Sequence, residues 1–220
     1  MMNKKQGFTF SEMLITMGIM AVILMILIPA VKNLQPNQSL VMFKKAYYVA
    51  ERVVSELVND DDYYPLVDDP DVGPFLANTE YVPCGSSSCG GNEKFCELFS
   101  KKLNISTDAS CVKRYFVDGA LPKGQFTTTD GVVWVLPITD FASDSTKYDI
   151  FMDVNGDRGP NCFYNESKCS APDRFSINIY QNGRLTVTGK REKQYLHAKD
   201  VSKTAGDFDK EEKEKQQQGN

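Results

Sequence analysis

The longest apolar stretch of the chain lies near its N-terminus, from Met13 to Val31, and it contains no charged side chain. Lys4 and Lys5 precede this stretch, and Glu12 stands at its edge. A helix of this length covers about 28 Å at a rise of about 1.5 Å per residue, which is close to the thickness of the hydrocarbon core of a bilayer. The pattern therefore predicts a membrane-spanning helix. The positive-inside rule places Lys4 and Lys5 in the cytoplasm and the rest of the chain outside it.

A second helix with a single apolar face is predicted after this stretch. Pro36 lacks a backbone donor and disfavours helix at the residue before it, so we expect an interruption at 33–37. Beyond the interruption, apolar residues recur at spacings of three and four: Leu40, Phe43, Tyr47, Ala50, Val54 and Leu57. This spacing indicates a helical face that packs on a protein core. The acidic run 60–62 is unfavourable at the negative end of a helix, so the helix should end near Asn59.

The remaining pattern predicts one more short helix and a small antiparallel sheet. Apolar residues at helical spacing indicate an amphipathic helix at 93–103. Runs rich in β-branched and aromatic residues predict strands at 112–117, 131–136, 148–154, 175–180 and 184–188. The last two runs flank Gln181-Asn182-Gly183, and Asn-Gly between alternating runs is a strong hairpin signal. The segment 190–220 is charged and rich in Gln with few aromatic residues, which predicts a disordered tail.

The charge balance and the cysteines narrow the function classes. The chain has 25 Lys and Arg against 29 Asp and Glu, a net charge of −4, and no basic stripe that would favour nucleic-acid binding. The six cysteines all follow the apolar stretch, which predicts disulfides in an oxidising compartment. Zinc is the alternative, but the chain has no Cys-x-x-Cys motif and a single histidine, His197.

Six cysteines allow 15 sets of three pairs, so the sequence alone does not fix the disulfides. We expect the pairs that close short local loops, because such loops bring their ends together at low entropic cost. These pairs are Cys84–Cys89, Cys96–Cys111 and Cys162–Cys169.

One segment has the residue types of a cation-binding loop. Asp153, Asn155 and Asp157 place oxygen side chains at alternate positions, and Gly156 permits a tight turn, as calcium loops require. The match to an EF-hand loop is incomplete, because Tyr164 stands where the bidentate glutamate should be. The alternative is a turn in which Asp and Asn side chains bond their own backbone. Calcium held by Asp153, Asn155 and Asp157 is the single cofactor hypothesis that the sequence offers.

The N-terminus has a specific arrangement: a short basic leader ends in Gly7, the sequence Phe8-Thr9-Phe10-Ser11-Glu12 follows, and an apolar helix begins. This arrangement resembles the class III signal of type IV pilins and type II secretion pseudopilins over residues 1–58. The resemblance implies that a prepilin peptidase cuts after Gly7, that the new N-terminal Phe8 is methylated, and that Glu12 is the carboxylate used in assembly. That carboxylate would pair with the Phe8 amine of its own chain or of a neighbouring chain.

The resemblance also implies an α+β, pilin-like fold, in which a long N-terminal transmembrane helix packs on a C-terminal antiparallel sheet with disulfide-stapled loops. We expect a prepilin leader, the transmembrane half of the helix, its amphipathic half, an extracytoplasmic globular domain and a charged tail at residues 1–7, 8–31, 32–59, 60–189 and 190–220.

The leading hypothesis is a structural subunit, a minor pilin or pseudopilin. It would be a single-pass protein of the inner membrane with an exterior domain, and would then enter a filament in the periplasm or at the cell surface. Its partners would be a prepilin peptidase, other pilin or pseudopilin subunits and an inner-membrane assembly platform. The alternative is a monomeric, membrane-anchored, extracytoplasmic binding module with calcium as its ligand. Catalysis is not expected, because the one histidine, His197, lies in the tail and cannot build a triad.

Overall fold

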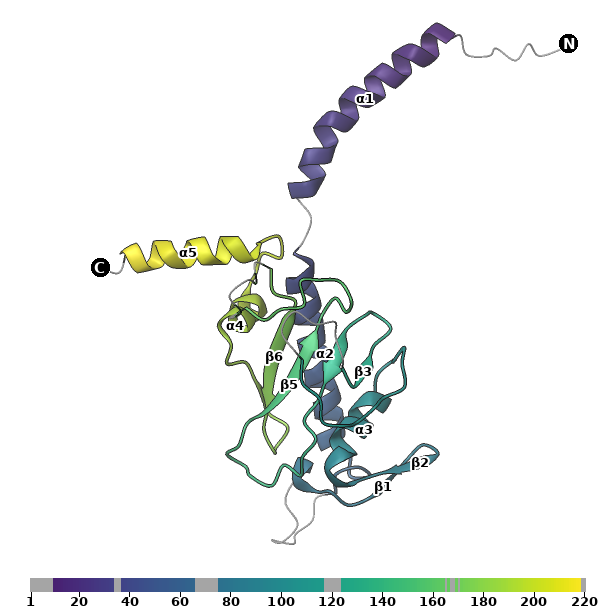
Figure 1. The fold of residues 1–220 in the computed structure, drawn as a ribbon, viewed down its shortest axis with the longest axis vertical. Coiled ribbons are helices and arrows are strands. Elements are labelled where there is room, and N and C mark those ends of the chain that lie inside the picture. Colours follow the sequence, from purple (N-terminus) through teal and green to yellow (C-terminus); the bar gives the residue numbers. More distant parts are fainter. Residues whose placement is uncertain are drawn as a thin grey trace, which may run out of the picture.

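The body of the structure is a helix laid across a five-stranded antiparallel sheet, which makes the fold α+β (Figure 1). The computed structural model describes residues 10–33, 37–65, 75–116, 124–164, 166, 169 and 171–218. A helix that belongs to the N-terminal region leads away from this body, and another helix near the C-terminus projects sideways from it.

The N-terminal region forms two helices with a break between them. Helix α1 covers Phe10–Asn33 and helix α2 covers Gln38–Val58. Asn37 caps α2 by accepting a hydrogen bond from the Leu40 N–H at 3.2 Å, which satisfies one of the unpaired donors of the first turn. Within the interruption expected at 33–37, Asn33 is still helical, Asn37 is extended as the cap of α2, and 34–36 lie outside the described residues. The helix end expected near Asn59, which is the C-cap of α2, is confirmed.

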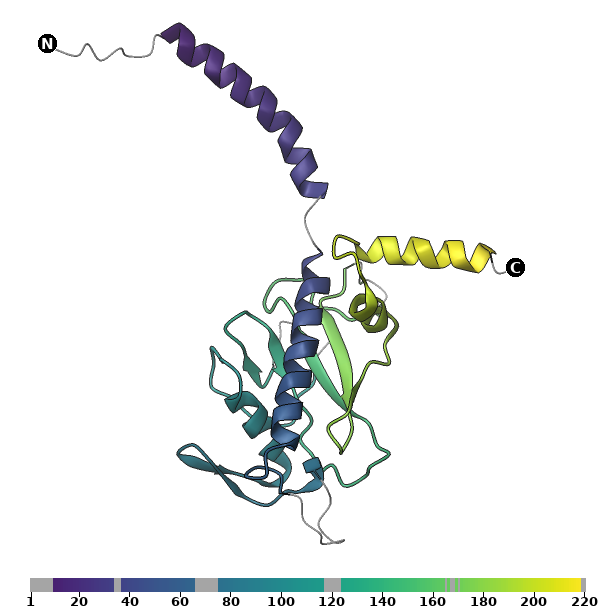
Figure 2. The ribbon, with the colours of Figure 1, turned by 180° about the vertical axis from the view of Figure 1, so that it is seen from behind.

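The apolar face of α2 forms the centre of the core. Figure 2 shows the helix running along one face of the sheet. The predicted stripe is buried along its whole length, as are two further residues, Ala46 and Val53. The buried residues of α2 are Leu40, Phe43, Ala46, Tyr47, Ala50, Val53, Val54 and Leu57. Phe43 meets Phe175 of the sheet with ring centroids 4.7 Å apart. Burial of this stripe therefore ties the helix to the sheet.

The sheet has the strand order β3-β4-β5-β6-β7, with every neighbouring pair antiparallel. Its strands are Phe126–Thr127, Val133–Val135, Tyr148–Asp153, Arg174–Ile179 and Leu185–Thr186. The strands predicted at 131–136, 148–154 and 184–188 are confirmed with shorter bounds, and the strand predicted at 175–180 is confirmed one residue earlier. Strand β3 was not predicted.

The predicted hairpin between β6 and β7 is also confirmed, since the Tyr180 N–H donates to the Arg184 carbonyl at 3.1 Å. Gly183 has a φ of 76° in its turn, and a Cβ there would lie 2.7 Å from the Val58 side chain. A glycine is therefore needed both for the turn and for the close approach to α2.

The strand predicted at 112–117 is wrong over 112–116, which are irregular, and residue 117 lies outside the described residues. The side chain of Gln125 takes the place of a strand partner there. Its amide donates to the carbonyls of Val112 at 3.0 Å and Leu136 at 2.9 Å, so the segment is held without a ladder of its own.

Disulfides hold the elements beside the sheet. The predicted helix at 93–103 is confirmed as α3, Lys94–Lys101, preceded by short 3₁₀ turns at Phe75–Ala77 and Gly91–Glu93. Strands β1, Val82–Cys84, and β2, Ser87–Cys89, form a small separate hairpin. The three predicted pairs are confirmed: Cys84–Cys89 joins β1 to β2, Cys96–Cys111 joins α3 to the following segment, and Cys162–Cys169 closes a loop.

The prediction of a disordered tail at 190–220 is wrong for its described part. Helix α4 covers Lys190–His197 and helix α5 covers Ala205–Gln218. Arg191 is 0% exposed, and its guanidinium pairs with Asp209 at 2.8 Å and stacks over the Tyr164 ring at 4.2 Å. Composition alone indicated solvated charges, but these contacts give a buried arginine both an ion partner and an aromatic surface.

Tyr195 of α4 connects this tail to the core. Its ring lies among Phe43, Phe175 and Phe208, and its hydroxyl accepts a hydrogen bond from the Asn37 side chain at 3.3 Å. The residue is 1% exposed, so its side chain joins α2, the sheet and α5 in one cluster.

We predict that Tyr195→Ala lowers the free energy of unfolding by about 3–5 kcal/mol, because the cavity it leaves is lined by three rings. Tyr48 on α2 is 55% exposed, so Tyr48→Ala, the matched control, should stay within about 0.5 kcal/mol of the wild type. Urea unfolding of the full chain in detergent measures both. Equal, small losses in the two variants would show that the tail is not docked.

Candidate functional site

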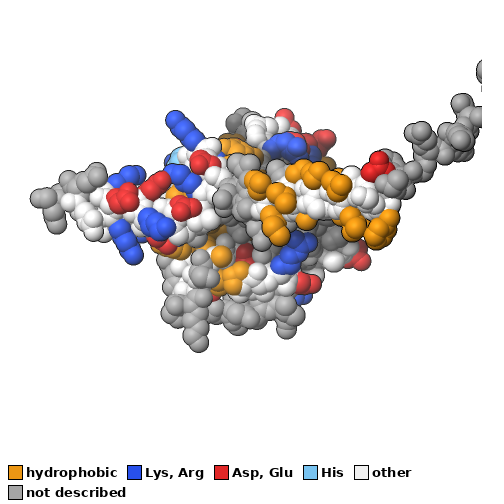
Figure 3. Space-filling model, turned by 90° about the horizontal axis from the view of Figure 1, so that it is seen from above, with side chains coloured by type: hydrophobic (Ala, Val, Ile, Leu, Met, Phe, Trp, Pro, Cys, Tyr) orange, Lys and Arg blue, Asp and Glu red, His pale blue; other side chains and the backbone are white. Residues whose placement is uncertain are grey.

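Helix α1 exposes an apolar surface that no other described part of the chain covers. Large apolar side chains from Met13 to Ile26 are 44–76% exposed, and Figure 3 shows those on one side of the helix. Because they occupy consecutive positions, such as Met13, Leu14 and Ile15, they lie on all faces of the helix. The Thr16 hydroxyl, a rare polar group in this stretch, donates to the Met13 carbonyl at 2.9 Å and so is satisfied within the helix. A helix that is apolar all round is stable where lipid or other apolar helices surround it.

A search of the described residues finds no helix that is both long and apolar enough to cross a membrane. The span predicted at 8–31 begins outside those residues.

Glu12 lies in the first turn of α1 and is exposed there. A carboxylate in this position is favoured by the partial positive charge at a helix N-terminus. The cleavage and methylation positions Gly7 and Phe8 lie outside the described residues. By sequence, Phe8 is one helical turn before Glu12, so an amine created at Phe8 would be within reach of a carboxylate of this kind.

The loop that follows β5 holds the residues predicted to bind calcium. Asp153, the last residue of β5, is 0% exposed, and its Oδ2 lies 3.0 Å from Nε of Arg174, which stands directly opposite in β6. Its Oδ1 accepts hydrogen bonds from the N–H groups of Asn155 at 3.3 Å and Gly156 at 3.0 Å. The carboxylate therefore closes an Asx turn and an ion pair at the same time.

This geometry favours the alternative reading of the loop over a calcium site. Asp157 is exposed, whereas Asp153 is fully buried beside Arg174. Within the described ranges, no group of three His, Cys, Asp or Glu side chains is placed to hold a metal ion. A calcium ion at Asp153, Asn155 and Asp157 would also have to displace the guanidinium that already neutralises Asp153.

A second buried acid that contacts this loop, Asp173, was not predicted from the sequence. Its carboxylate is 0% exposed and accepts two hydrogen bonds of 2.9 Å, from the N–H of Asn161 to Oδ2 and from the N–H of Cys162 to Oδ1. Asp173 and Arg174 thus both brace the loop from the start of β6. The available signal was an adjacent acid and base at the head of an apolar strand, where each needs a partner once buried.

Burial raises the pKa of Asp153 to about 6, and Arg174 opposes this effect. Because the folded-state pKa lies above the usual value of about 3.9, the folded state binds a proton more readily than the unfolded chain. The contribution of Asp153 to stability is therefore fully present below about pH 4 and is lost as the pH rises through 6.

We predict that Arg174→Ala lowers the stability of the full chain by about 3–5 kcal/mol at pH 8, because it leaves a buried carboxylate without its partner. The loss should be smaller at pH 5, where Asp153 takes up a proton. Arg158→Ala, in the same loop but exposed, is the matched control and should have little effect. Thermal unfolding at both pH values, in calcium and in chelator, measures this. A rise in the Tm of the wild type with calcium would instead support calcium binding by this loop.

One comparison with known proteins identifies the N-terminal region. Residues 2–28 match the family model described as the prokaryotic N-terminal methylation motif. Neither the curated proteins nor the solved structures compared with the chain gave a match. The matched range includes Gly7, Phe8 and Glu12. Residues 2–28 therefore carry the class III prepilin signal of type IV pilins and pseudopilins.

Proposed function

We propose that this protein is a structural subunit of a type IV pilus or a type II secretion-type filament, a minor pilin or pseudopilin that a prepilin peptidase processes. The observation that carries the proposal is the methylation motif at residues 2–28, whose range includes the exposed apolar side chains of α1 from Met13 to Ile26. The motif supplies the processing signal, and the helix supplies a surface for lipid before assembly and for other subunits after it.

Processing would prepare the docking end of the helix. Cleavage after Gly7 creates an amine at Phe8, which the peptidase then methylates. In an apolar surrounding, a lone ammonium or a lone carboxylate is unfavourable by several kcal/mol, so the Phe8 amine and Glu12 favour pairing. When the pair forms between neighbouring chains, it fixes how far one α1 is staggered against the next. Glu12 would thereby position a new subunit in the filament.

The fold agrees with this role. An amphipathic second helix on an antiparallel sheet is the arrangement expected of a pilin-like domain, and it holds α1 clear of the body (Figures 1 and 2). The three disulfides suit a domain outside the cytoplasm, carried by α1 in the inner membrane until an assembly platform transfers it to the filament. The sideways α5 would crowd a filament made of one subunit type, which favours a minor subunit.

The second candidate function, a monomeric anchored binding module, is less well supported. Its proposed ligand was calcium, and the loop geometry gives Asp153 an internal partner instead. An anchored receptor also has no need of a processing motif at residues 2–28.

We predict that co-expression with a prepilin peptidase removes residues 1–7 and leaves a methylated Phe8, because the motif places the junction between Gly7 and Phe8. Gly7→Leu should retain the leader, since a bulky side chain would block close approach of the peptidase. Gly18→Ala is the matched control: a Cβ there meets nothing within 4 Å, so processing should continue. Intact-mass analysis of membrane extracts measures the loss of the leader and the added methyl group in the wild type and in both variants. A wild-type chain that keeps Met1, or that is cut near Ala30, contradicts the proposed function.

A further inference from the structure

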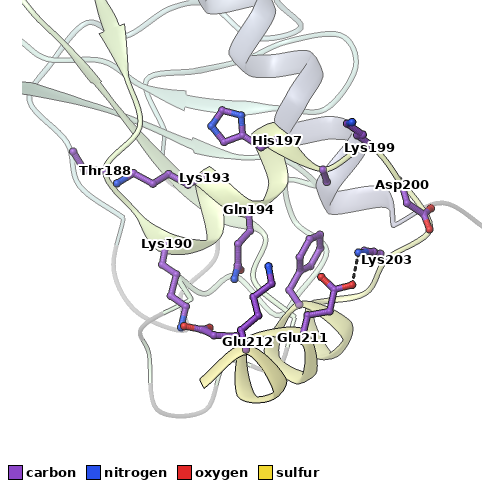
Figure 4. Close-up of a pocket in the computed structure, with 13 residues that line it drawn as sticks. Thr188, Lys190, Lys193, Gln194, His197, Lys199, Asp200, Lys203, Glu211 and Glu212 are labelled. Atoms are coloured by element: carbon purple, nitrogen blue, oxygen red, sulfur yellow. Dashed lines mark hydrogen bonds and ion pairs between the residues drawn. The ribbon is translucent and has the colours of Figure 1, made fainter. Parts of the chain in front are cut away.

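A groove between α4 and α5 gathers positive charge in a chain that is acidic overall. The groove has a volume of about 790 Å³ and is lined by five lysines against three carboxylates (Figure 4). The chain as a whole carries a net charge of −4. We call this feature the lysine groove. Its charged lining residues are Lys190, Lys193, Lys199, Lys203, Lys215, Asp200, Glu211 and Glu212.

Two of the five lysines are neutralised inside the groove. Lys190 pairs with Glu212 and Lys203 pairs with Glu211, and these contacts raise the pKa of both lysines. The remaining carboxylate, Asp200, accepts hydrogen bonds from the N–H and hydroxyl of Ser202 at 2.8 and 2.7 Å. Glu211 and Glu212 are therefore already paired and do not neutralise the other three lysines.

The other three lysines of the groove are exposed. Lys193 lies on α4, Lys199 on the connection after it, and Lys215 on α5. None of the three has an acidic partner within 4.0 Å among the residues that the structure describes. Because the ion pairs neutralise Lys190 and Lys203, these three lysines outnumber the one remaining carboxylate, Asp200. The groove therefore has an excess of positive charge that favours an anion.

The groove lies at the end of the domain from which α1 departs. Asn37, four residues after the end of α1, donates from its backbone to the Val201 carbonyl at 2.7 Å and from its side chain to the Lys203 carbonyl at 2.9 Å. The charged side chains of the α4–α5 region are visible from the side on which α1 leaves the body (Figure 3). Any bilayer that holds α1 would therefore face this groove.

We propose that the lysine groove binds the anionic headgroups of the membrane that holds α1, before the subunit is assembled. The proposal rests on the proposed function, because it needs α1 in a bilayer. Lys193, Lys199 and Lys215 would contact lipid phosphates, and α5 would lie along the membrane surface. This contact sets the orientation of the domain at the membrane, and it is released when the subunit moves into a filament.

The test places the full mature chain, one copy per disc, in lipid nanodiscs of phosphatidylcholine alone or with phosphatidylglycerol. Brief acetylation followed by peptide mass spectrometry then reads each lysine. Lys193, Lys199 and Lys215 should be labelled about fivefold more slowly in anionic discs, the effect expected for a lysine at an anionic surface. In about 1 M salt, where the screening length falls to about 3 Å, the difference should vanish.

The internal control is Lys147, which is exposed and precedes β5 at the end of the sheet away from α1. Tyr148 pairs with Ile179 there, and the adjoining hairpin lies against Val58. The acetylation rate of Lys147 should be the same in both kinds of disc. As a variant pair, Lys193→Gln/Lys199→Gln should reduce the lipid-dependent protection of Lys215, whereas Lys113→Gln/Lys147→Gln should leave it intact.

Each contrary outcome overturns a different statement. Equal labelling of the groove lysines in both discs overturns the headgroup site and leaves the proposed function standing. Protection in phosphatidylcholine discs on adding inorganic phosphate shows a soluble anion site instead, and protection only with several copies per disc shows a second copy of the chain as the partner. A chain that enters neither disc overturns the headgroup site together with the membrane stage of the proposed function.

Discussion

The burial of one face of α2 against the sheet is the interaction on which the rest of the structure depends. Phe43 and Phe175 meet in this interface, and residues at both ends of the helix make further contacts. At the N-terminal end Asn37 bonds to the segment between α4 and α5, and at the C-terminal end Val58 packs against the hairpin glycine Gly183. The position at which α1 leaves the domain is thereby set by the core.

The two N-terminal helices differ in whether their apolar surfaces are buried within the chain. The stripe of α2 is buried within the chain, and its opposite face carries charge, so it needs no external partner. The surface of α1 is apolar on all sides and exposed from Met13 to Ile26, so its partners lie outside the chain. This contrast, together with the processing motif at residues 2–28, is the basis on which we propose anchoring and assembly for α1.

Local patterns predicted the parts of the fold that depend on periodicity and on short loops. The α2 stripe, the hairpin at 181–183 and the three disulfide pairs are of this kind. The buried charges were not predictable, because their partners lie far away in the sequence. Arg174 of β6 pairs with Asp153 of the neighbouring strand β5, and Arg191 of α4 pairs with Asp209 of α5. Composition treats such residues as solvated until the fold supplies their partners. The 153–157 loop shows the same limit. Its residue types predicted a calcium ion, whereas the partner that the fold places beside Asp153, Arg174, could not be read from the loop itself.

The central claim, assembly through α1, is tested most directly by the side chain of Glu12. Filaments would be isolated from cells that express Glu12→Gln with the partner subunits, and Glu51→Gln on the exposed face of α2 would be the control. Loss of the carboxylate leaves the docking ammonium without its partner, which is unfavourable by several kcal/mol. The account predicts unchanged membrane levels for both variants, and at least about tenfold less Glu12→Gln than Glu51→Gln in the filaments. Equal incorporation of the two variants would contradict it.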